Sequence, residues 1–129
     1  TRTVCVGKPS DKMKSVYETV LTAQLTALDA VKAGMSGKAL DKIARDIITE
    51  AGYGDNFGHS LGHGVGVEIH ESPYASPSRE DILPENSIVT VEPGIYLEGK
   101  FGVRIEDFVV VTENGCINMT KAPKELICL

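Results

Sequence analysis

The apolar residues at the start of the chain recur at intervals of three or four positions, as they do on one face of an α-helix. This spacing predicts a helix over 11–33, with Ser10 as its N-cap and Gly34 after its end. The positions that carry the pattern are Val16, Val20, Ala23, Ala27 and Val31. Three further leucines widen the apolar arc, so we expect this helix to be buried on more than one side.

Beyond residue 36 the same spacing returns and predicts a second helix over 37–51. Its apolar face comprises Leu40, Ile43, Ala44, Ile47, Ile48 and Ala51. Most of the charged residues are expected on the opposite, solvent-facing side, namely Lys38, Asp41, Lys42, Arg45, Asp46 and Glu50.

From residue 58 onward, frequent glycines exclude a stable helix, and apolar residues alternate with polar ones in the manner of strands. Strands are expected over 1–6, 65–70, 88–92 and 103–112, with a further short strand near Ile127. The segment 72–85 contains three prolines and is predicted to be a loop. Two helices followed by several strands indicate an α+β fold, in which helices pack on an antiparallel sheet.

Composition narrows the choice of function. The chain has 129 residues, which suits one domain or a part of one. It carries 13 basic and 18 acidic residues, and the net charge of −5 argues against a nucleic-acid partner. The longest strongly apolar run, 108–111, is far too short to span a membrane. The three cysteines are widely spaced, so we expect no disulfide framework and no thiolate metal site, and we expect a cytoplasmic protein.

All three histidines lie within twelve residues, and the glycines around them let the backbone approach a ligand closely. In an extended chain His59 and His63 face the same way, whereas His70 has the opposite parity and joins them only through a twist or a bulge. An ordinary structural role for each histidine is the alternative, but their clustering favours a functional site.

Two glutamates occupy strand patterns that are otherwise mainly apolar. Glu92 shares a strand face with Thr90, and Glu106 lies two residues beyond Arg104 on the same face. A buried carboxylate is costly unless it is paired or bound to a metal, so an ion pair with Arg104, metal binding and a solvated strand face all remain open. Asp107 faces the opposite side of its strand, which favours a structural role.

A histidine nitrogen and two carboxylates form a donor set that suits Zn²⁺, Mn²⁺, Co²⁺ or Fe²⁺. In this chain the candidates are His63, Glu92 and Glu106. Carboxylates can bridge two such ions, and a pair of ions activates a water molecule for attack on a carbonyl group. Three ligands are too few for two ions, so a dinuclear site needs ligands from outside these residues.

Four motifs stand out in the second part of the chain: Gly62-His63-Gly64-Val65-Gly66, His70-Glu71-Ser72-Pro73, Thr90-Val91-Glu92-Pro93-Gly94-Ile95-Tyr96 and Gly102-Val103-Arg104-Ile105-Glu106-Asp107. In this order they resemble the Xaa-Pro peptidases, the aminopeptidase P and prolidase branch of the creatinase-like, pita-bread metallopeptidases. The resemblance covers essentially the whole chain and is most specific over 58–113. It implies the C-terminal half of a pita-bread fold, two helices packed on a curved antiparallel sheet.

The resemblance implies five ligands for two divalent metal ions: two aspartates, one histidine and two glutamates. His63, Glu92 and Glu106 match the histidine and the glutamates, with Glu106 bridging both ions. Ions of Mn, Co, Zn or Fe are all compatible with such a site.

The resemblance also implies which residues act on a peptide substrate with proline at its second position. His59 and His70 match histidines that lie near the scissile carbonyl group. Glu92 doubles as the group that moves protons, and Arg104 matches an arginine that orients the carboxylates.

The two aspartate ligands have no counterpart among these residues. The family places the second one just before a Thr-Arg-Thr strand, and this chain opens with Thr1, Arg2 and Thr3. We therefore expect 1–129 to be the C-terminal portion of a metallopeptidase catalytic domain, without its first half or any N-terminal domain. Alone it is expected to be inactive, to bind at most one ion weakly, and to form homo-oligomers through surfaces that the first half covers.

Two other functions remain open on the sequence. One is a non-catalytic creatinase-like binding module, and the other is a peptidase similar to methionine aminopeptidases. Retention of His63, Glu92 and Glu106 argues against the first, and the pattern of Arg104, Glu106 and Asp107 argues against the second.

Overall fold

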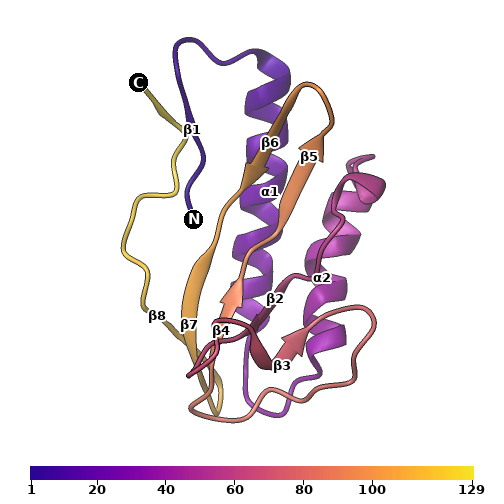
Figure 1. Cartoon of the computed structure of the whole chain (residues 1–129), viewed down its shortest axis with the longest axis vertical. Helices are drawn as coiled ribbons and strands as arrows, with labels where there is room; N and C mark the ends of the chain where they lie inside the picture. The colour runs from indigo at the N-terminus through magenta and orange to yellow at the C-terminus, as the bar shows by residue number, and fades with distance from the viewer.

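The computed structural model describes the whole chain, Thr1 to Leu129, and places two helices against a set of short strands (Figure 1). Helix α1 spans Asp11–Ala30, helix α2 spans Gly37–Glu50, and one turn of 3-10 helix, η1, follows at Gly54–Asn56. The strands are β1 (Val4–Cys5), β2 (Gly62–Gly64), β3 (Glu71–Ala75), β4 (Ile88–Val91), β5 (Gly94–Leu97), β6 (Phe101–Arg104), β7 (Asp107–Thr112), β8 (Gly115–Asn118) and β9 (Ile127–Cys128). Neither helix combines the length and the apolar character that crossing a bilayer requires.

Five strands form one antiparallel sheet in the order β3-β2-β4-β7-β8. Strands β5 and β6 form a separate antiparallel hairpin, and β1 pairs in parallel with β9. The helices pack against each other, and Figure 1 shows α1 running behind the β5–β6 hairpin with α2 beside it. The α+β class predicted from the order of elements is therefore confirmed.

Helix α1 begins where the sequence predicts. Ser10 accepts a hydrogen bond from the backbone N–H of Met13 at 3.2 Å, and Asp11 stands in the first turn. The helix ends at Ala30, before the predicted end at residue 33, because the backbone of Val31 leaves the helical conformation. The predicted apolar line is wholly buried, at Val16, Val20, Ala23, Ala27 and Val31. It joins a core that also contains Leu40, Ala44 and Ile48 of α2 and Val89, Val91, Val109 and Val111 of the sheet.

Helix α2 ends one residue before the predicted bound and buries most of the predicted apolar face. Leu40, Ala44 and Ile48 are fully buried and Ile43 and Ile47 partly so, whereas Ala51, beyond the end of the helix, is exposed. Asp41 corrects the prediction, because its side chain is 1% exposed rather than solvent-facing. It forms an ion pair with Arg45, and burial of a carboxylate is tolerated only with such a partner.

The segment 65–70 is not a strand, contrary to the prediction from its alternating pattern. It leaves the sheet in a turn, in which the carboxylate of Glu71 accepts the backbone N–H of Glu68 at 3.1 Å. Val67 and Ile69 are exposed, although the pattern placed them toward a core. Val65 still donates its backbone N–H to the carbonyl oxygen of Ile88 in β4 at 3.0 Å, but 66–70 pair with no strand, so the apolar residues there have no sheet face to pack on.

Two other strand predictions also change. The segment 72–85 is not wholly a loop, because β3 lies at its start, and an edge strand of the sheet tolerates Pro73. The strand predicted over 103–112 is divided into β6 and β7, because Pro93 in the facing chain has no backbone N–H to continue the ladder. Strands β2, β5 and β8 were not predicted, and β1 is shorter than expected.

The division of this strand sets two glutamates opposite each other. Val91 pairs with Asp107 just before the interruption, and the pairs of β5 with β6 continue the same register after it. Glu92 therefore lies opposite Glu106. Like charges in directly opposite positions destabilise a strand pair unless a cation lies nearby.

Candidate functional site

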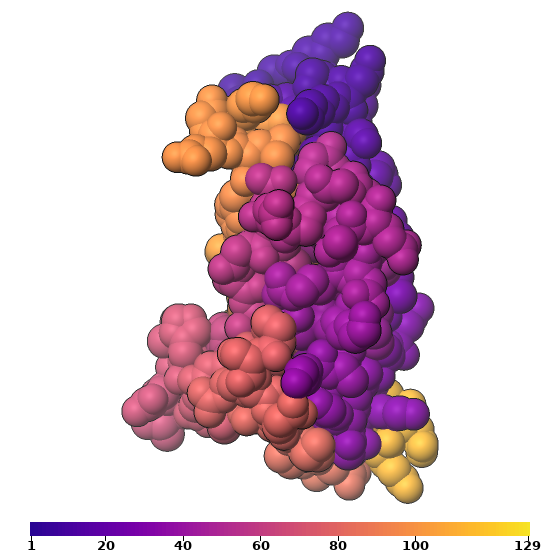
Figure 2. All heavy atoms as spheres, turned by 90° about the vertical axis from the view of Figure 1, so that its right-hand side faces the viewer, coloured from indigo at the N-terminus to yellow at the C-terminus, as the bar shows by residue number.

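Of the side chains that the sequence singles out, all but Glu106 line one open pocket of about 480 Å³. Its lining consists of His59, Ser60, Gly62, His63, His70, Tyr74, Glu92 and Arg104. Figure 2 shows the edge of the molecule hollowed between two projections, the β5–β6 turn in orange and the segment between β2 and β3 in pink. The three histidines share this pocket: His59 precedes β2, His63 lies in β2 and His70 directly precedes β3.

The first feature of the pocket is the contact between His63 and Glu92. Nε2 of His63 lies 3.1 Å from Oε1 of Glu92. Nδ1 of His63 lies 2.9 Å from the carbonyl oxygen of Gly64, which can only accept, so Nδ1 carries a proton. In the neutral form of the ring, Nε2 is then unprotonated and faces a carboxylate oxygen. Two acceptors at this distance need a shared cation, either a proton or a metal ion.

Glycine and threonine hold this pair in place. A side chain at Gly62 would put its Cβ 1.9 Å from the carbonyl oxygen of Thr90, so only glycine lets β2 lie this close to β4. The hydroxyl of Thr90 accepts the backbone N–H of His63 at 3.0 Å and donates to Oε1 of Glu92 at 2.8 Å. The side chain of Thr90 therefore positions both His63 and Glu92.

Arg104 stands between two carboxylates. Its Nε lies 3.9 Å from Oε2 of Glu92 and 3.8 Å from Oε2 of Glu106, beyond hydrogen-bond length, and it is buried without a hydrogen-bond partner. A hydrogen bond to the hydroxyl of Tyr96 raises the pKa of Arg104. Burial raises the pKa of Glu106, but the hydroxyl of Thr1 and the charge of Arg104 outweigh it, so this pKa lies below its ordinary value.

The donor types in the pocket fit a divalent metal, but the ligand set is incomplete. The structure contains no group of three or more His, Cys, Asp or Glu side chains placed to hold a metal ion. It brings His63 to Glu92 and sets Glu106 opposite Glu92. The Nδ1–H bond from His63 to a carbonyl is the arrangement that orients a metal-binding imidazole. Assignment of all three residues as ligands stays a prediction.

The other two histidines flank the pair. The ring of His70 lies 4.3 Å from the ring of His63, between centroids. A register shift between β2 and β3, located between His63 and Gly64, brings them together, which is the kind of bulge that the sequence required. Nε2 of His59 lies 3.2 Å from the hydroxyl of Tyr96.

Asp107 lies outside the pocket, on the other side of the strand from Glu106. Its side chain has no exposed surface, and it accepts hydrogen bonds from Arg2, Lys124 and Asn118 at 2.8, 2.7 and 2.6 Å. Burial raises the pKa of Asp107, but hydrogen bonding by Lys124, Gln24, Asn118 and Arg2 outweighs it and lowers this pKa to about 2. Such complete pairing indicates a structural carboxylate.

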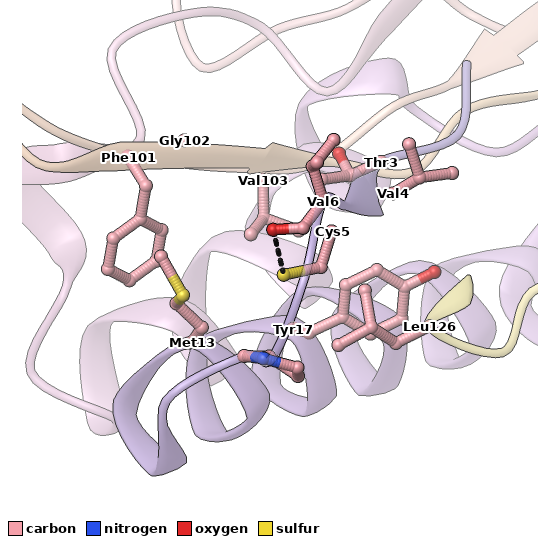
Figure 3. Close-up of a pocket in the computed structure, with 11 residues that line it drawn as sticks. Thr3, Val4, Cys5, Val6, Met13, Tyr17, Phe101, Gly102, Val103 and Leu126 are labelled. Carbon is pink, nitrogen blue, oxygen red and sulfur yellow. Dashed lines mark hydrogen bonds between the residues drawn. The ribbon is translucent and has the colours of Figure 1, made fainter. Parts of the chain in front are cut away.

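A second pocket, of about 200 Å³, lies between β1, the start of α1 and β6 (Figure 3). Its lining is mainly apolar, and Figure 3 shows the Sγ of Cys5 in contact with the carbonyl oxygen of Val6. None of the predicted site residues lines it, so we place no chemistry there.

Sequence reasoning missed the ion pair of Asp41 and Arg45 behind the histidines. Arg45 donates hydrogen bonds to the carbonyl oxygens of Phe57 and His59. The spacing of an acidic and a basic residue four positions apart on a helix was visible. It did not distinguish this buried pair from the exposed pair of Lys42 and Asp46 on the same helix.

A model of metallopeptidase family M24 matches residues 1–113 of the chain. The chain belongs to this family. The family name assigns it to the metallopeptidases, in agreement with the histidine and carboxylate donors of the pocket.

Relatives of this M24 chain are named for proline-containing substrates. It is 55% identical over 127 residues to an Xaa-Pro dipeptidase of Pyrococcus furiosus, a match that covers 98% of this chain and 36% of the relative. An Xaa-Pro dipeptidase structure from Bacillus anthracis superposes with a TM-score of 0.97 at 53% identity, over 99% of this chain and 36% of that one. An X-Pro aminopeptidase structure from Thermotoga maritima gives 0.95 at 54% identity, over 99% and 36%.

These matches show which part of the M24 relatives this chain corresponds to. The two helices and the antiparallel sheet correspond to part of the solved prolidase and dipeptidase structures, including prolidase from Pyrococcus furiosus with a TM-score of 0.92. The chain spans about a third of the length of these relatives. Activity and substrate of the whole protein are therefore matters for proposal.

Proposed function

We propose that the protein to which this chain belongs hydrolyses the peptide bond between an N-terminal residue and a following proline, using two divalent metal ions. The observation that carries the proposal is the pair of His63 and Glu92, in which Nε2 of His63 lies 3.1 Å from a carboxylate oxygen and Glu106 stands opposite Glu92. That arrangement calls for a cation, and the names of the relatives supply the substrate class.

His63, Glu92 and Glu106 would hold the metal ions together with ligands from outside these residues. Metal ions bound there lower the pKa of a water molecule and polarise the substrate carbonyl group. We leave open which of Mn, Co, Zn or Fe is used, because imidazole and carboxylate ligands accept all four.

The remaining steps belong to side chains of this chain. Glu92 takes a proton from the attacking water at a carboxylate oxygen and delivers it to the leaving nitrogen of proline. His59 and His70 hold the scissile carbonyl group and donate hydrogen bonds to the oxygen as negative charge develops. Arg104 keeps the carboxylates of Glu92 and Glu106 oriented by its charge.

We further propose that residues 1–129 alone do not hydrolyse peptides, because they bring only two candidate ligands into contact. The family resemblance places the two missing aspartates upstream. A cytoplasmic location and a homo-oligomeric state are part of the same proposal.

The proposal is tested with the full-length protein, freed of metal and then reloaded separately with Mn²⁺, Co²⁺, Zn²⁺ or Fe²⁺. We expect hydrolysis of Ala-Pro and no comparable hydrolysis of Ala-Ala, with loss of activity on chelation. His63→Ala is expected to abolish turnover, whereas Glu50→Gln, an exposed position at the end of α2, is expected to retain it.

Absence of turnover with every metal would contradict the proposal. If Xaa-Pro peptides then bind without being cleaved, the creatinase-like binding module is the correct function. A tripeptide such as Ala-Pro-Ala, assayed beside Ala-Pro, separates an aminopeptidase from a dipeptidase, since both names occur among the similar structures.

A further inference from the structure

We propose that Asp41 and Arg45 of helix α2 are positioning residues that set His59 and the main chain of Glu92 in the pocket. This inference rests on the proposed peptidase function. It concerns residues outside the pocket lining, on a helix that the sequence predicted to be solvent-facing at these positions.

The first step is the geometry of the pair itself. Nε of Arg45 lies 2.7 Å from Oδ2 of Asp41, and Nη2 lies 2.9 Å from Oδ1, so the guanidinium grips both carboxylate oxygens. The side chain of Asp41 is 1% exposed and that of Arg45 is 25% exposed. A two-pronged contact of this kind fixes orientation as well as distance.

The second step is the contact of Arg45 with the segment that carries His59. Nη1 donates to the carbonyl oxygen of Phe57 at 2.9 Å, and Nη2 donates to the carbonyl oxygen of His59 at 2.8 Å. The guanidinium carbon also lies 4.2 Å from the centroid of the Phe57 ring, and that ring meets the His59 ring edge-on at 5.0 Å. Arg45 thus holds both the main chain of His59 and the ring against which its imidazole packs.

The third step leads from Asp41 to the glutamate of the pocket. Oδ1 of Asp41 accepts the backbone N–H of Leu61 at 2.9 Å. The carbonyl oxygen of the same Leu61 accepts the backbone N–H of Glu92 at 2.8 Å. A single residue, Leu61, therefore connects a buried helix carboxylate to the main chain of a proposed metal ligand.

A second pair on the same helix serves as the matched control. Lys42 and Asp46 have the same spacing and a contact of 2.6 Å, but their side chains are 72% and 52% exposed. They make no hydrogen bond to the segment 57–63. Exposed pairs of this kind contribute little.

The test uses Arg45→Lys in the full-length, metal-loaded protein. Lysine keeps the charge but cannot contact two carboxylate oxygens and two carbonyl oxygens at once. We expect kcat/KM for Ala-Pro to fall by roughly 10- to 100-fold at unchanged metal content, since displacement of a reacting group by about 1 Å costs this much. Lys42→Gln is expected to keep the activity of the unsubstituted protein.

A spectroscopic readout distinguishes positioning from a general loss of stability. The ¹⁵N signals of the His59 imidazole are expected to shift or broaden in Arg45→Lys, whereas those of His70, which does not touch the pair, are expected to stay in place. If Arg45→Lys does not fold, Asp41→Asn is used, because it keeps the volume and an oxygen for the N–H of Leu61 while releasing Arg45.

Unchanged His59 signals would overturn the inference, whether or not activity falls. So would retained kcat/KM in a folded Arg45→Lys protein. If the unsubstituted protein cleaves no Xaa-Pro peptide, the proposed function fails, and the His59 signals alone then decide whether the pair positions this histidine.

Discussion

Glu106 and Asp107 are neighbours in the sequence, yet they stand in opposite environments. Asp107 has no exposed surface and accepts three short hydrogen bonds from Arg2, Lys124 and Asn118. Glu106 lies opposite Glu92, with Arg104 Nε at 3.8 Å, beyond hydrogen-bond length, and its Oε2 accepts a hydrogen bond from the hydroxyl of Thr1. The first carboxylate is fully enclosed by three hydrogen-bonding side chains, whereas the second stays partly exposed and accepts from the side chain of Thr1 alone.

The contrast separates a structural carboxylate from one arranged for chemistry. Full pairing stabilises a buried charge and leaves it nothing further to bind. A partly exposed carboxylate with few partners keeps oxygen lone pairs available for a bound cation. Glu92, whose Oε1 lies 3.1 Å from Nε2 of His63, belongs with Glu106 in this respect. Four changes test whether the two regions differ as described.

The largest expected effect follows Glu92→Gln in the full-length protein. Because the amide cannot take up a proton from water, we expect kcat for Ala-Pro to fall about 1,000-fold, or about 4 kcal/mol in the barrier. Steady-state kinetics and circular dichroism measure the loss and the integrity of the fold. A fall of less than tenfold would remove Glu92 from the chemistry.

Asp107→Asn is expected to act on stability instead. It removes the charge that pairs with Arg2 and Lys124, so the free energy of unfolding should fall by about 3 kcal/mol. Urea unfolding measures this, and kcat per folded molecule should change little. Unaltered stability together with lost activity would reverse the roles assigned to the two regions.

Lowering the pH should also reduce the free energy of unfolding through Asp107. The pKa of Asp107 is about 2 in the folded protein and 3.8 ordinarily, so its ionised form contributes stability above pH 4 that is lost as the pH falls toward 2. We expect a loss of about 2 kcal/mol over this window. Asp107→Asn should lack this part of the pH dependence, and an identical acid profile in both proteins would contradict the assignment.

The smallest expected effect follows Arg104→Lys. Lysine keeps a positive charge near Glu92 and Glu106 but loses the guanidinium that donates to the hydroxyl of Tyr96. Residues that orient metal ligands typically contribute 10- to 100-fold, so we expect activity or metal affinity to fall about tenfold. Calorimetric metal titration measures the metal affinity, and kinetics of the reloaded protein measure the activity. Full retention of both would show that Arg104 does not orient the metal ligands.

Local periodicity predicted the helices well because each helix buries one continuous face. All five residues of the apolar line from Val16 to Val31 are buried, and Ser10 caps the helix as expected. The same reasoning failed for Asp41. Amphipathic spacing assumes that the polar side of a helix faces solvent, and it does not predict that another part of the chain packs on that side.

The strands were harder to predict because their partners lie elsewhere in the chain. Alternation over 65–70 resembles a strand, but only Val65 bonds to the sheet, and Val67 and Ile69 remain exposed. The pocket residues were found by their chemistry and by the family resemblance. Their geometry, including the bulge that joins His70 to His63, depends on register between strands, which no local pattern specifies.

The central claim is that His63, Glu92 and Glu106 bind metal while Asp107 does not. The most direct test is a crystal structure of the full-length, metal-loaded protein, with diffraction collected at the absorption edge of the metal. We predict two anomalous peaks, with His63 Nε2 and the carboxylates of Glu92 and Glu106 at about 2.0–2.3 Å from a metal position and Asp107 still bound to Lys124. Absence of a peak at these side chains, or metal bound at Asp107, would contradict the account.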